Sequence, residues 1–348
     1  MGVIVSVVSF ETDAVKRIIL NFAQEVQKQI PSNFQKKDRV IVIAGPTCCG
    51  KTSTSLEIAK MIDGEIVSGD SIQVYRGMDI GTAKATREER LNTPHHLIDV
   101  RDIQENFNVV DFYYEARQSC QQILERGNVP IVVGGSGFYL HTLLYGPPSG
   151  PPSVPELRRA LEEEMEQIGA EALYERLVGL DPQYAKTITK NDKQKIVRAL
   201  EIMTLGTKKV SKLSWRGRRR PQNYDFHCWF LHRPKDKLYE RIDDRCDRML
   251  ADGFLEEVVR LDKEGLRNNT SAAQAIGYRQ ALEFLTSPQT PTDYEYFVRS
   301  FKQATRHYAK RQLTWFRRDE RIKWFNIDEY KDSINLVKYI IIYIGGKI

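Results

Sequence analysis

Residues 45–52 read GPTCCGKT and contain the residue types that bind a phosphate group. Gly45 and Gly50 allow backbone angles that turn successive N–H groups toward one anion. Lys51 adds a mobile positive charge, and the Thr52 hydroxyl is a suitable ligand for Mg²⁺. We therefore expect a phosphate-binding loop made of Gly45, Pro46, Thr47, Cys48, Cys49, Gly50, Lys51 and Thr52.

The elements beside this loop are those that a phosphate-binding loop requires. The apolar residues 40–44 predict a strand, and residues 53–62 predict a helix. The N-terminus of that helix adds a partial positive charge at the loop, which also tends to lower the pKa of a neighbouring thiol. A phosphate site alone leaves ATP or GTP hydrolysis, kinase chemistry and alkyl transfer from a diphosphate open.

A carboxylate at Asp70 follows the next predicted strand, residues 65–68. In an open parallel sheet, ligands bind outside the carboxyl ends of the strands, so Asp70 is expected to face the same crevice as Lys51. A carboxylate there can bind a metal or accept a proton. Asp99 ends a third predicted strand, residues 96–99, and invites comparison with the metal-binding aspartate of an ATPase. No acidic residue directly follows Asp99 to polarise a water, which weakens that interpretation.

Short β-type runs alternate with helix-type runs over residues 40–144. The predicted strands are 40–44, 65–68, 96–99 and 130–133, and the predicted helices between them are 53–62, 86–91 and 109–126. This alternation predicts an α/β fold of the P-loop NTPase type, with a parallel sheet flanked by helices. Later in the chain we expect a strand at 224–231 and helices at 235–250 and 301–318.

The composition changes at residues 146–155, GPPSGPPSVP, which mark a domain boundary. Proline and glycine at this density cannot continue a helix or a central strand. Two predicted helices at 156–179 and one at 192–205 follow. We expect an N-terminal extension (1–38), the first part of the catalytic core (39–145), an inserted all-helical domain (146–222), the second part of the core with C-terminal helices (223–330) and an apolar tail (331–348).

Four ordered stretches resemble the tRNA dimethylallyltransferases. They are GPTCCGKT, DSIQVYRGMDIGTAK at 70–84, PHHLIDV at 94–100 and VGGSGFYL at 133–140. Members of this family transfer a five-carbon isoprenoid from dimethylallyl diphosphate to an adenosine beside the tRNA anticodon. The resemblance runs from about Arg39 to about Trp324, and it implies that the inserted helical domain closes over tRNA.

The resemblance implies roles for individual residues. Arg245 lies against the diphosphate in the family pattern, and Asp70 would act as general base on the adenine amine while Thr47 orients the same site. The expected cofactor is Mg²⁺ near Thr52. The expected tRNA-binding residues are Asp70, Ser71, Ile72, Gln73, Ser136, Arg158, Gln194, Lys195, Ile196, Val197, Arg198, Gln274, Ala275, Ile276, Gly277, Tyr278 and Arg279. A final element, KRQLTW at 310–315, would pack on the core and line the tRNA face.

Other functions remain compatible with parts of the sequence. A kinase or ATPase would keep the loop but consume ATP, and an isopentenyltransferase for free nucleotides shares GPT-x-x-GK but modifies AMP, ADP or ATP. A non-enzymatic RNA-binding module does not need the intact loop together with Asp70. The inserted domain and the basic residues favour tRNA as acceptor.

The net charge and the cysteine spacing restrict the possible functions less than the motifs do. A formal net charge of +6 permits a polyanionic partner. The most basic stretch, 208–220, contains Trp215, whose ring could stack on an unpaired base while the cations bind phosphates. Five cysteines without a C-x-x-C pair argue against a disulfide framework or a zinc site. The apolar terminal runs are too short to span a bilayer. We expect a cytoplasmic monomer that binds the tRNA anticodon loop.

Overall fold

The computed structural model describes residues 39–206, 208–213 and 224–329. The chain divides into two compact units, which we call the core unit (residues 1–144 and 223–348) and the helical unit (residues 145–222). The predicted N-terminal extension, Trp215 with most of its basic stretch, and the predicted apolar tail lie outside the described residues. In the part of the chain that is described, no helix is long and apolar enough to cross a membrane.

The core unit is built on a six-stranded parallel sheet, which confirms the predicted α/β fold class. The strand order is β3-β2-β4-β1-β5-β6. The strands are β1 (Arg39–Ala44), β2 (Gly64–Ser68), β3 (His95–His96), β4 (Val129–Gly134), β5 (Asp225–His232) and β6 (Lys323–Asn326). The order places β1 inside the sheet, between β4 and β5.

Strand β1 owes its central place to apolar side chains on both of its faces. Val40, Ile41, Val42 and Ile43 are all at most 1% exposed. Strands buried on both faces of a parallel sheet have such continuous apolar runs, because helices cover the two faces. The residues that follow Ala44 therefore emerge at the carboxyl edge of the sheet, where ligands bind in this fold class.

Helices α2 (Lys51–Ile62), α3 (Arg87–Asn92), α4 (Val109–Glu125) and α5 (Gly137–Tyr145) connect or follow the first four strands. The start of α4 is fixed by a capping box, in which Asn108 accepts from the N–H of Asp111 and Asp111 accepts from the N–H of Asn108. Phe112, Ala116 and Ile123 are buried and share one stripe of α4. Helix α4 thereby covers the sheet beside β2 and β4.

The third strand is much shorter than predicted. β3 contains only His95 and His96, because Leu97 (φ 61°) and Asp99 (φ 57°) adopt the left-handed conformation, which cannot continue a strand. The Asp99 carboxylate lies 2.6 Å from Lys84 Nζ and 2.6 Å from an Arg90 nitrogen. Burial alone would raise the pKa of Asp99, but hydrogen bonds from Lys84 and Arg90 lower it. Asp99 therefore holds two cations in place and does not correspond to the metal-binding aspartate of an ATPase.

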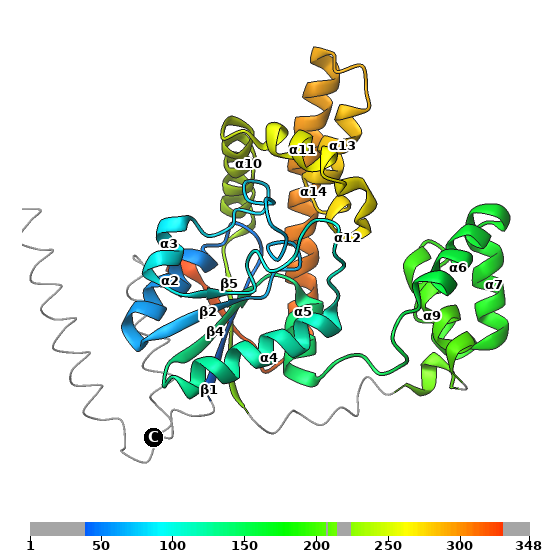
Figure 1. The fold of residues 1–348 in the computed structure, drawn as a ribbon, viewed down its shortest axis with the longest axis horizontal. Coiled ribbons are helices and arrows are strands. Elements are labelled where there is room, and N and C mark those ends of the chain that lie inside the picture. The colour runs from blue at the N-terminus through cyan, green and yellow to red at the C-terminus, as the bar shows by residue number, and fades with distance from the viewer. Residues whose placement is uncertain (1–38, 207, 214–223, 330–348) are drawn as a thin grey trace, which may run out of the picture. The chain divides into compact units, whose positions relative to one another are not determined.

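The second part of the core unit is mostly helical. Its helices are α10 (Lys235–Ala251), α11 (Phe254–Lys263), α12 (Thr270–Ala273), α13 (Tyr278–Leu285) and α14 (Pro291–Phe316). Figure 1 shows α10 to α13 gathered beyond the carboxyl end of the sheet, while α14 runs from them back alongside it. Helix α14 starts ten residues before the predicted helix because Thr290 forms a capping box with Asp293. Strand β6 was not predicted, since four residues carry too little periodicity to be recognised.

The helical unit has a hydrophobic core of its own. Its helices are α6 (Pro155–Ile168), α7 (Ala170–Leu180), α8 (Pro182–Ala185) and α9 (Lys193–Leu205). Leu173, Leu177, Ile196 and Val197 are at most 1% exposed and pack in this core. The helices predicted within 156–179 and at 192–205 match α6, α7 and α9 to within a few residues.

Candidate active site

The glycine-rich loop lies between β1 and α2, as the sequence predicts. Gly50 precedes the first turn of α2 with φ 107°, a conformation that residues with a Cβ rarely adopt. Helix α2 has no acidic side chain in its first turn, so nothing there opposes the positive end of the helix dipole. Lys51 follows directly, and its Nζ donates to the carbonyl oxygens of Gly45 (3.0 Å) and Pro46 (2.8 Å). The Lys51 ammonium thus lies across the mouth of the loop.

Three arginines from outside the loop hold its backbone and side chains. Arg233 donates to the Cys49 carbonyl (3.1 Å) and Arg241 to the Cys48 carbonyl (3.0 Å). Arg245 donates to the Thr47 hydroxyl at 3.0 Å. Arg245 was expected at this place, whereas Arg233 was missed because no local motif marks it. Arg241 and Arg245 of α10 therefore add positive charge near the loop to that of Lys51, whereas Arg233 at the end of β5 is ion-paired with Asp328.

The two cysteines of the loop differ in exposure. Cys48 is half-buried, and Cys49 is fully buried. Burial raises the pKa of the Cys49 thiol, even though the positive charge of Lys51 acts in the opposite direction. The expected lowering of a thiol pKa by the helix N-terminus is thus wrong for Cys49, because desolvation of the thiolate outweighs it. Cys49 is a packed side chain whose contribution to the loop is its backbone.

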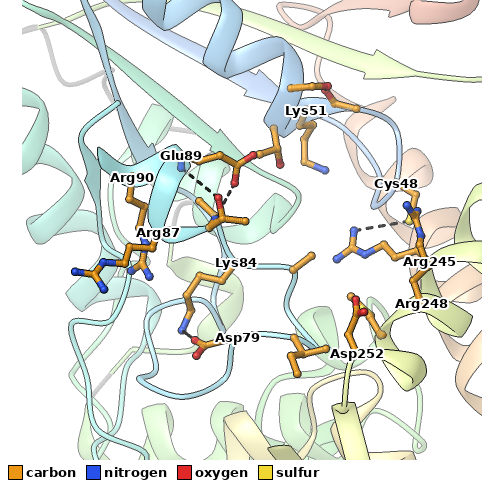
Figure 2. Close-up of a pocket in the computed structure, with 18 of the residues that line it drawn as sticks. Cys48, Lys51, Asp79, Lys84, Arg87, Glu89, Arg90, Arg245, Arg248 and Asp252 are labelled. Carbon is orange, nitrogen blue, oxygen red and sulfur yellow. Dashed lines mark hydrogen bonds and ion pairs between the residues drawn. The ribbon is translucent and has the colours of Figure 1, made fainter. Parts of the chain in front are cut away.

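A cavity of about 740 Å³ opens in front of the loop, and we call it the loop cavity. Its walls include Lys51 and Thr52 from the loop, Arg87 from the start of α3, and Arg245 and Arg248 from α10. Figure 2 shows Lys51 and Arg245 pointing into the same space from different elements. A cavity lined by this many cations, with hydroxyls at Thr52, Ser53 and Thr86, is suited to a ligand with several phosphate oxygens.

A second cavity of about 330 Å³, which we call the Asp70 cavity, shares Arg245 and Met249 with the first. Asp70 and Thr47 also line it. Oδ1 of Asp70 accepts from the N–H of Ile72 (2.8 Å) and of Gln73 (3.4 Å), which orients the carboxylate. The two cavities therefore meet at Arg245. The arrangement offers anion binding on one side and a carboxylate proton acceptor on the other.

The loop that carries Asp70 is held from behind by Glu257 of α11. This carboxylate is 7% exposed and accepts from the N–H groups of Asp79 (2.9 Å), Ile80 (2.7 Å) and Gly81 (3.2 Å). It also accepts from the Tyr278 hydroxyl at 2.6 Å, and burial raises the pKa of Tyr278 well above its usual value. Sequence reasoning missed Glu257 because a Glu-rich helix start resembles an ordinary solvated surface.

Helix α14 forms another wall of the Asp70 cavity through Tyr308 and Arg311. Ser136 and Gln312 act on Tyr308 in the direction that lowers the pKa of its hydroxyl. Burial, together with the negative charge of nearby Asp70, raises the pKa of Tyr308 to about 12. Tyr308 therefore stays protonated near neutral pH and cannot replace Asp70 as a base. The predicted KRQLTW element contains Gln312 and Arg311, but the sequence did not assign either side chain to the site.

Comparison with known proteins agrees with this geometry. The family model described as IPP transferase matches residues 73–319, more than two thirds of the chain. A tRNA dimethylallyltransferase of Protochlamydia amoebophila is 71% identical over 327 residues, which cover 94% of this chain and 95% of that protein. The chain belongs to the tRNA dimethylallyltransferase family. This family membership confirms the resemblance that the four sequence stretches predicted.

Further members of the family are similar over most of their length. The tRNA dimethylallyltransferase of Chlamydia pneumoniae is 53% identical, and the match covers 81% of this chain and 83% of that protein.

The match to the Protochlamydia protein extends into the first 38 residues, because its 327 residues exceed the 310 that lie at 39–348. The similarity to this one relative therefore starts before Arg39, whereas the family model begins at residue 73.

Solved structures of the family have the same fold. The crystal structure of the tRNA isopentenylpyrophosphate transferase from Bacillus halodurans gives a TM-score of 0.64 at 37% identity, covering 89% of this chain and 98% of that one. A eukaryotic dimethylallyltransferase acting on tRNA gives a TM-score of 0.73 at 30% identity, covering 88% of this chain and 79% of that one. Both identities are high enough to support the family as well as the fold.

The expected tRNA-binding residues of the core unit fall into two groups. Ser71, Ile72, Gln274, Ala275 and Ile276 line the Asp70 cavity. Other side chains are engaged within the protein: Gln73 bonds to Ser68 and to the Thr82 carbonyl, Tyr278 is fully buried, and Gly277 is buried beside Phe301. Arg279 is exposed, 3.8 Å from Glu283. Tyr278 also lines the Asp70 cavity, and its hydroxyl donates to Glu257 inside the core.

The expected tRNA-binding residues of the helical unit are mostly occupied with internal contacts. Ile196 and Val197 are core side chains, so their expected contact with tRNA is wrong for the side chains. Arg198 lies 2.5 Å from the buried Glu201 and donates to the Pro151 carbonyl at 2.6 Å. Arg158 pairs with Glu162 one turn later. Gln194 is exposed, and exposed Lys195 pairs only with Asp192, so these two can still reach a ligand.

The residues at the loop could hold the expected Mg²⁺ ion together with a bound phosphate ligand. Mg²⁺ is usually held by one or two protein oxygens, with substrate phosphates and waters completing its shell. Thr52 supplies such an oxygen at the exposed first turn of α2, on the wall of the loop cavity. Among the described residues, no three His, Cys, Asp or Glu side chains form a metal-binding group. The protein therefore offers a site that depends on the oxygens of a bound phosphate ligand.

Proposed function

We propose that this chain transfers the dimethylallyl group from dimethylallyl diphosphate to the exocyclic amine of the adenosine 3′-adjacent to the anticodon in tRNA, releasing diphosphate. The observation that carries the proposal is the shared wall at Arg245. On one side of it lie Lys51 and Thr52 of the glycine-rich loop, and on the other lie Asp70 and Thr47, which is the loop residue that lines the Asp70 cavity. Donor diphosphate and acceptor amine would therefore meet at this residue.

The donor diphosphate is proposed to bind in the loop cavity. Lys51 would leave the carbonyl oxygens of Gly45 and Pro46 and move to the phosphate oxygens, and Arg245 would bind from the opposite side. Both cations stabilise the negative charge that develops on the leaving diphosphate as the bond from carbon to oxygen breaks. Thr52 would hold Mg²⁺, which adds further neutralisation of the phosphate charge when it is bound.

The acceptor adenine is proposed to enter the Asp70 cavity. An adenine must leave its stack to reach a crevice at the end of a sheet, and in a single-stranded anticodon loop this costs less than in a duplex. The amine nitrogen forms the new bond to the isoprenoid carbon, and the proton that it loses passes to the Asp70 carboxylate. The Thr47 hydroxyl, held by Arg245, would orient the reacting groups.

Two alternative functions are less well supported than tRNA modification. A motor ATPase needs an aspartate for its metal, but Asp99 is already paired with Lys84 and Arg90. A transferase for free adenine nucleotides has the same loop, but the relatives that match over most of the chain carry tRNA in their names. Free nucleotides as acceptors are therefore the second outcome that the test must distinguish.

The test supplies purified protein with Mg²⁺, labelled dimethylallyl diphosphate and unmodified tRNA, and measures the label that enters RNA. A parallel reaction offers AMP and ATP as acceptors, and the Asp70→Asn variant serves as control. We expect label in tRNA only, and in much smaller amount with the variant. Label in free nucleotide, or ATP turnover without transfer to either acceptor, would overturn the proposal.

A further inference from the structure

Gln312 of α14 connects the two glycine-rich turns of the site. Its side-chain Oε1 accepts from the N–H of Thr47 at 3.0 Å, and its Nε2 donates to the Gly135 carbonyl at 3.0 Å. Thr47 lies in the loop after β1, and Gly135 lies in the turn between β4 and α5. One amide therefore fixes the distance between two loops that are 88 positions apart in the chain.

Both ends of the Gln312 amide are hydrogen-bonded inside the protein. Gln312 is 5% exposed and lies one turn after Tyr308 on α14. A buried polar group is costly unless it is hydrogen-bonded, and here both the oxygen and the nitrogen are used. A Cβ on Gly135 would lie 2.1 Å from Nε2, so the second glycine turn leaves room for this amide and for little else.

The bond to Thr47 determines the orientation of a residue at the reaction centre. Because the Thr47 N–H is directed to Gln312, it is not one of the loop N–H groups that can face a diphosphate. The Thr47 hydroxyl is instead held against Arg245 at 3.0 Å, and both residues line the Asp70 cavity. The chain of contacts runs from Gly135 through Gln312 and Thr47 to Arg245.

We propose that Gln312 is a positioning residue for the transfer reaction, which sets Thr47, and through it Arg245, at the junction of the two cavities. This inference rests on the proposed function. Gln312 itself does not line either cavity, so it acts on the reacting groups only through Thr47. A misplacement of about 1 Å at a reacting centre can cost on the order of 100-fold in rate, which sets the size of the effect.

The first test is the rate of transfer by Gln312→Ala and Gln312→Glu at saturating donor and tRNA. We expect kcat to fall about 10- to 100-fold, while KM for each substrate changes by less than about threefold, since binding does not involve the Gln312 side chain. The Gln312→Glu variant would retain the acceptor for Thr47 but place an anionic oxygen against the Gly135 carbonyl, so its rate should also fall. Gln303→Ala, which changes an exposed glutamine on the same helix, is the matched control and should leave kcat unchanged.

The second test asks whether Gln312 acts through Thr47. In a double-mutant cycle, Gln312→Ala should cost much less in a Thr47→Val background than in the native protein, because the hydroxyl to be positioned is already absent. Additive effects would overturn the inference, as would a native kcat in both Gln312 variants. If Gln312→Ala does not fold, as judged by circular dichroism, the isosteric Gln312→Glu variant carries the same test. Absence of transfer by the native protein would contradict the proposed function instead.

Discussion

Glu257 in the core unit and Glu201 in the helical unit are both buried carboxylates, but they bind different kinds of partner. Glu257 accepts three successive backbone N–H groups of the loop at 79–81, which borders both cavities. Glu201 accepts from the Ser153 hydroxyl, the Val154 N–H and the Arg198 guanidinium, which join the start of α6 to α9. The first carboxylate shapes a ligand site, and the second holds helices together.

This difference explains why more of the predicted ligand-binding side chains line a cavity in the core unit than remain available in the helical unit. In the core unit, three backbone N–H groups and the Tyr278 hydroxyl satisfy Glu257, and the side chains of Lys51, Asp70 and Arg245 line a cavity. In the helical unit, a predicted ligand-binding arginine is itself the partner of the buried charge. A cation in a sequence motif is available to a ligand only when no internal anion requires it.

The largest effect is expected at Asp70. Asn at this position keeps the oxygen that accepts from the Ile72 N–H but removes the proton acceptor, so transfer should slow by about 1,000-fold, within the usual range for general bases. Single-turnover label transfer measures this, and a filter-binding assay should give a tRNA affinity within about threefold of the native value. A native rate with intact binding would show that Asp70 is not the base.

Lys51→Ala should have the next largest effect, on donor binding. A hydrogen bond to a charged group contributes about 1.5–3 kcal/mol, so the KM for dimethylallyl diphosphate should rise about 10- to 100-fold. Lys60→Ala is the matched control, because Lys60 lies on the same helix, is exposed and pairs with Glu57. An unchanged donor KM in Lys51→Ala would contradict the assignment of the loop as the diphosphate site.

Arg198 and Lys195 on α9 allow a cation that stabilises the helical unit to be compared with a cation that can bind a ligand. Arg198→Ala leaves Glu201 buried without its cation, so we expect a loss of about 2–3 kcal/mol in the stability of the helical unit, reduced from the cost at a fully buried pair because Arg198 is 32% exposed. Lys195→Ala should change stability by less than about 1 kcal/mol. If Lys195 binds a tRNA phosphate, its removal should lower the salt dependence of tRNA affinity by about one ion. Thermal melts and salt titrations separate the two outcomes.

Glu257→Gln and Glu201→Gln compare the two buried carboxylates directly. Each should lower the free energy of unfolding by about 1–3 kcal/mol, since hydrogen bonds to a charged acceptor are weakened. Only Glu257→Gln should also lower kcat at saturating substrates, by about tenfold, because the wall of the Asp70 cavity moves. Equal losses of kcat in both variants would remove the distinction between the units.

The smallest effect concerns acid stability at Glu65. Burial alone would raise the pKa of this carboxyl, but hydrogen bonds from Arg126, Asn128 and His96 lower it to about 2. A lowered folded-state pKa adds stability that is present above the unfolded value of about 4.3 and is lost as the pH falls toward 2. Glu65→Gln should therefore flatten the dependence of melting temperature on pH between about 4.5 and 2. An unchanged slope would show that Glu65 contributes little to acid unfolding.

The sequence by itself determined the features that depend on residues close together in the chain. A strand, a glycine turn and a helix around GPTCCGKT are local features, and so is the proline-rich stretch at 146–155. The alternation of strand-type and helix-type runs over residues 40–144 also predicted a parallel sheet. Once Lys51 and Asp70 were assigned to the ends of two strands, the fold class placed them at the same edge of the sheet.

The tertiary structure decided what each polar side chain binds. Asp99 pairs with Lys84 and Arg90, and Arg198 pairs with Glu201, and no local pattern predicts these partners. Glu257 and Gln312 reach the site from 176 and 265 positions away along the chain, and no local pattern records such a contact. Their roles arise because a buried polar group must find a partner wherever packing places one, and the sequence near each residue does not contain that partner.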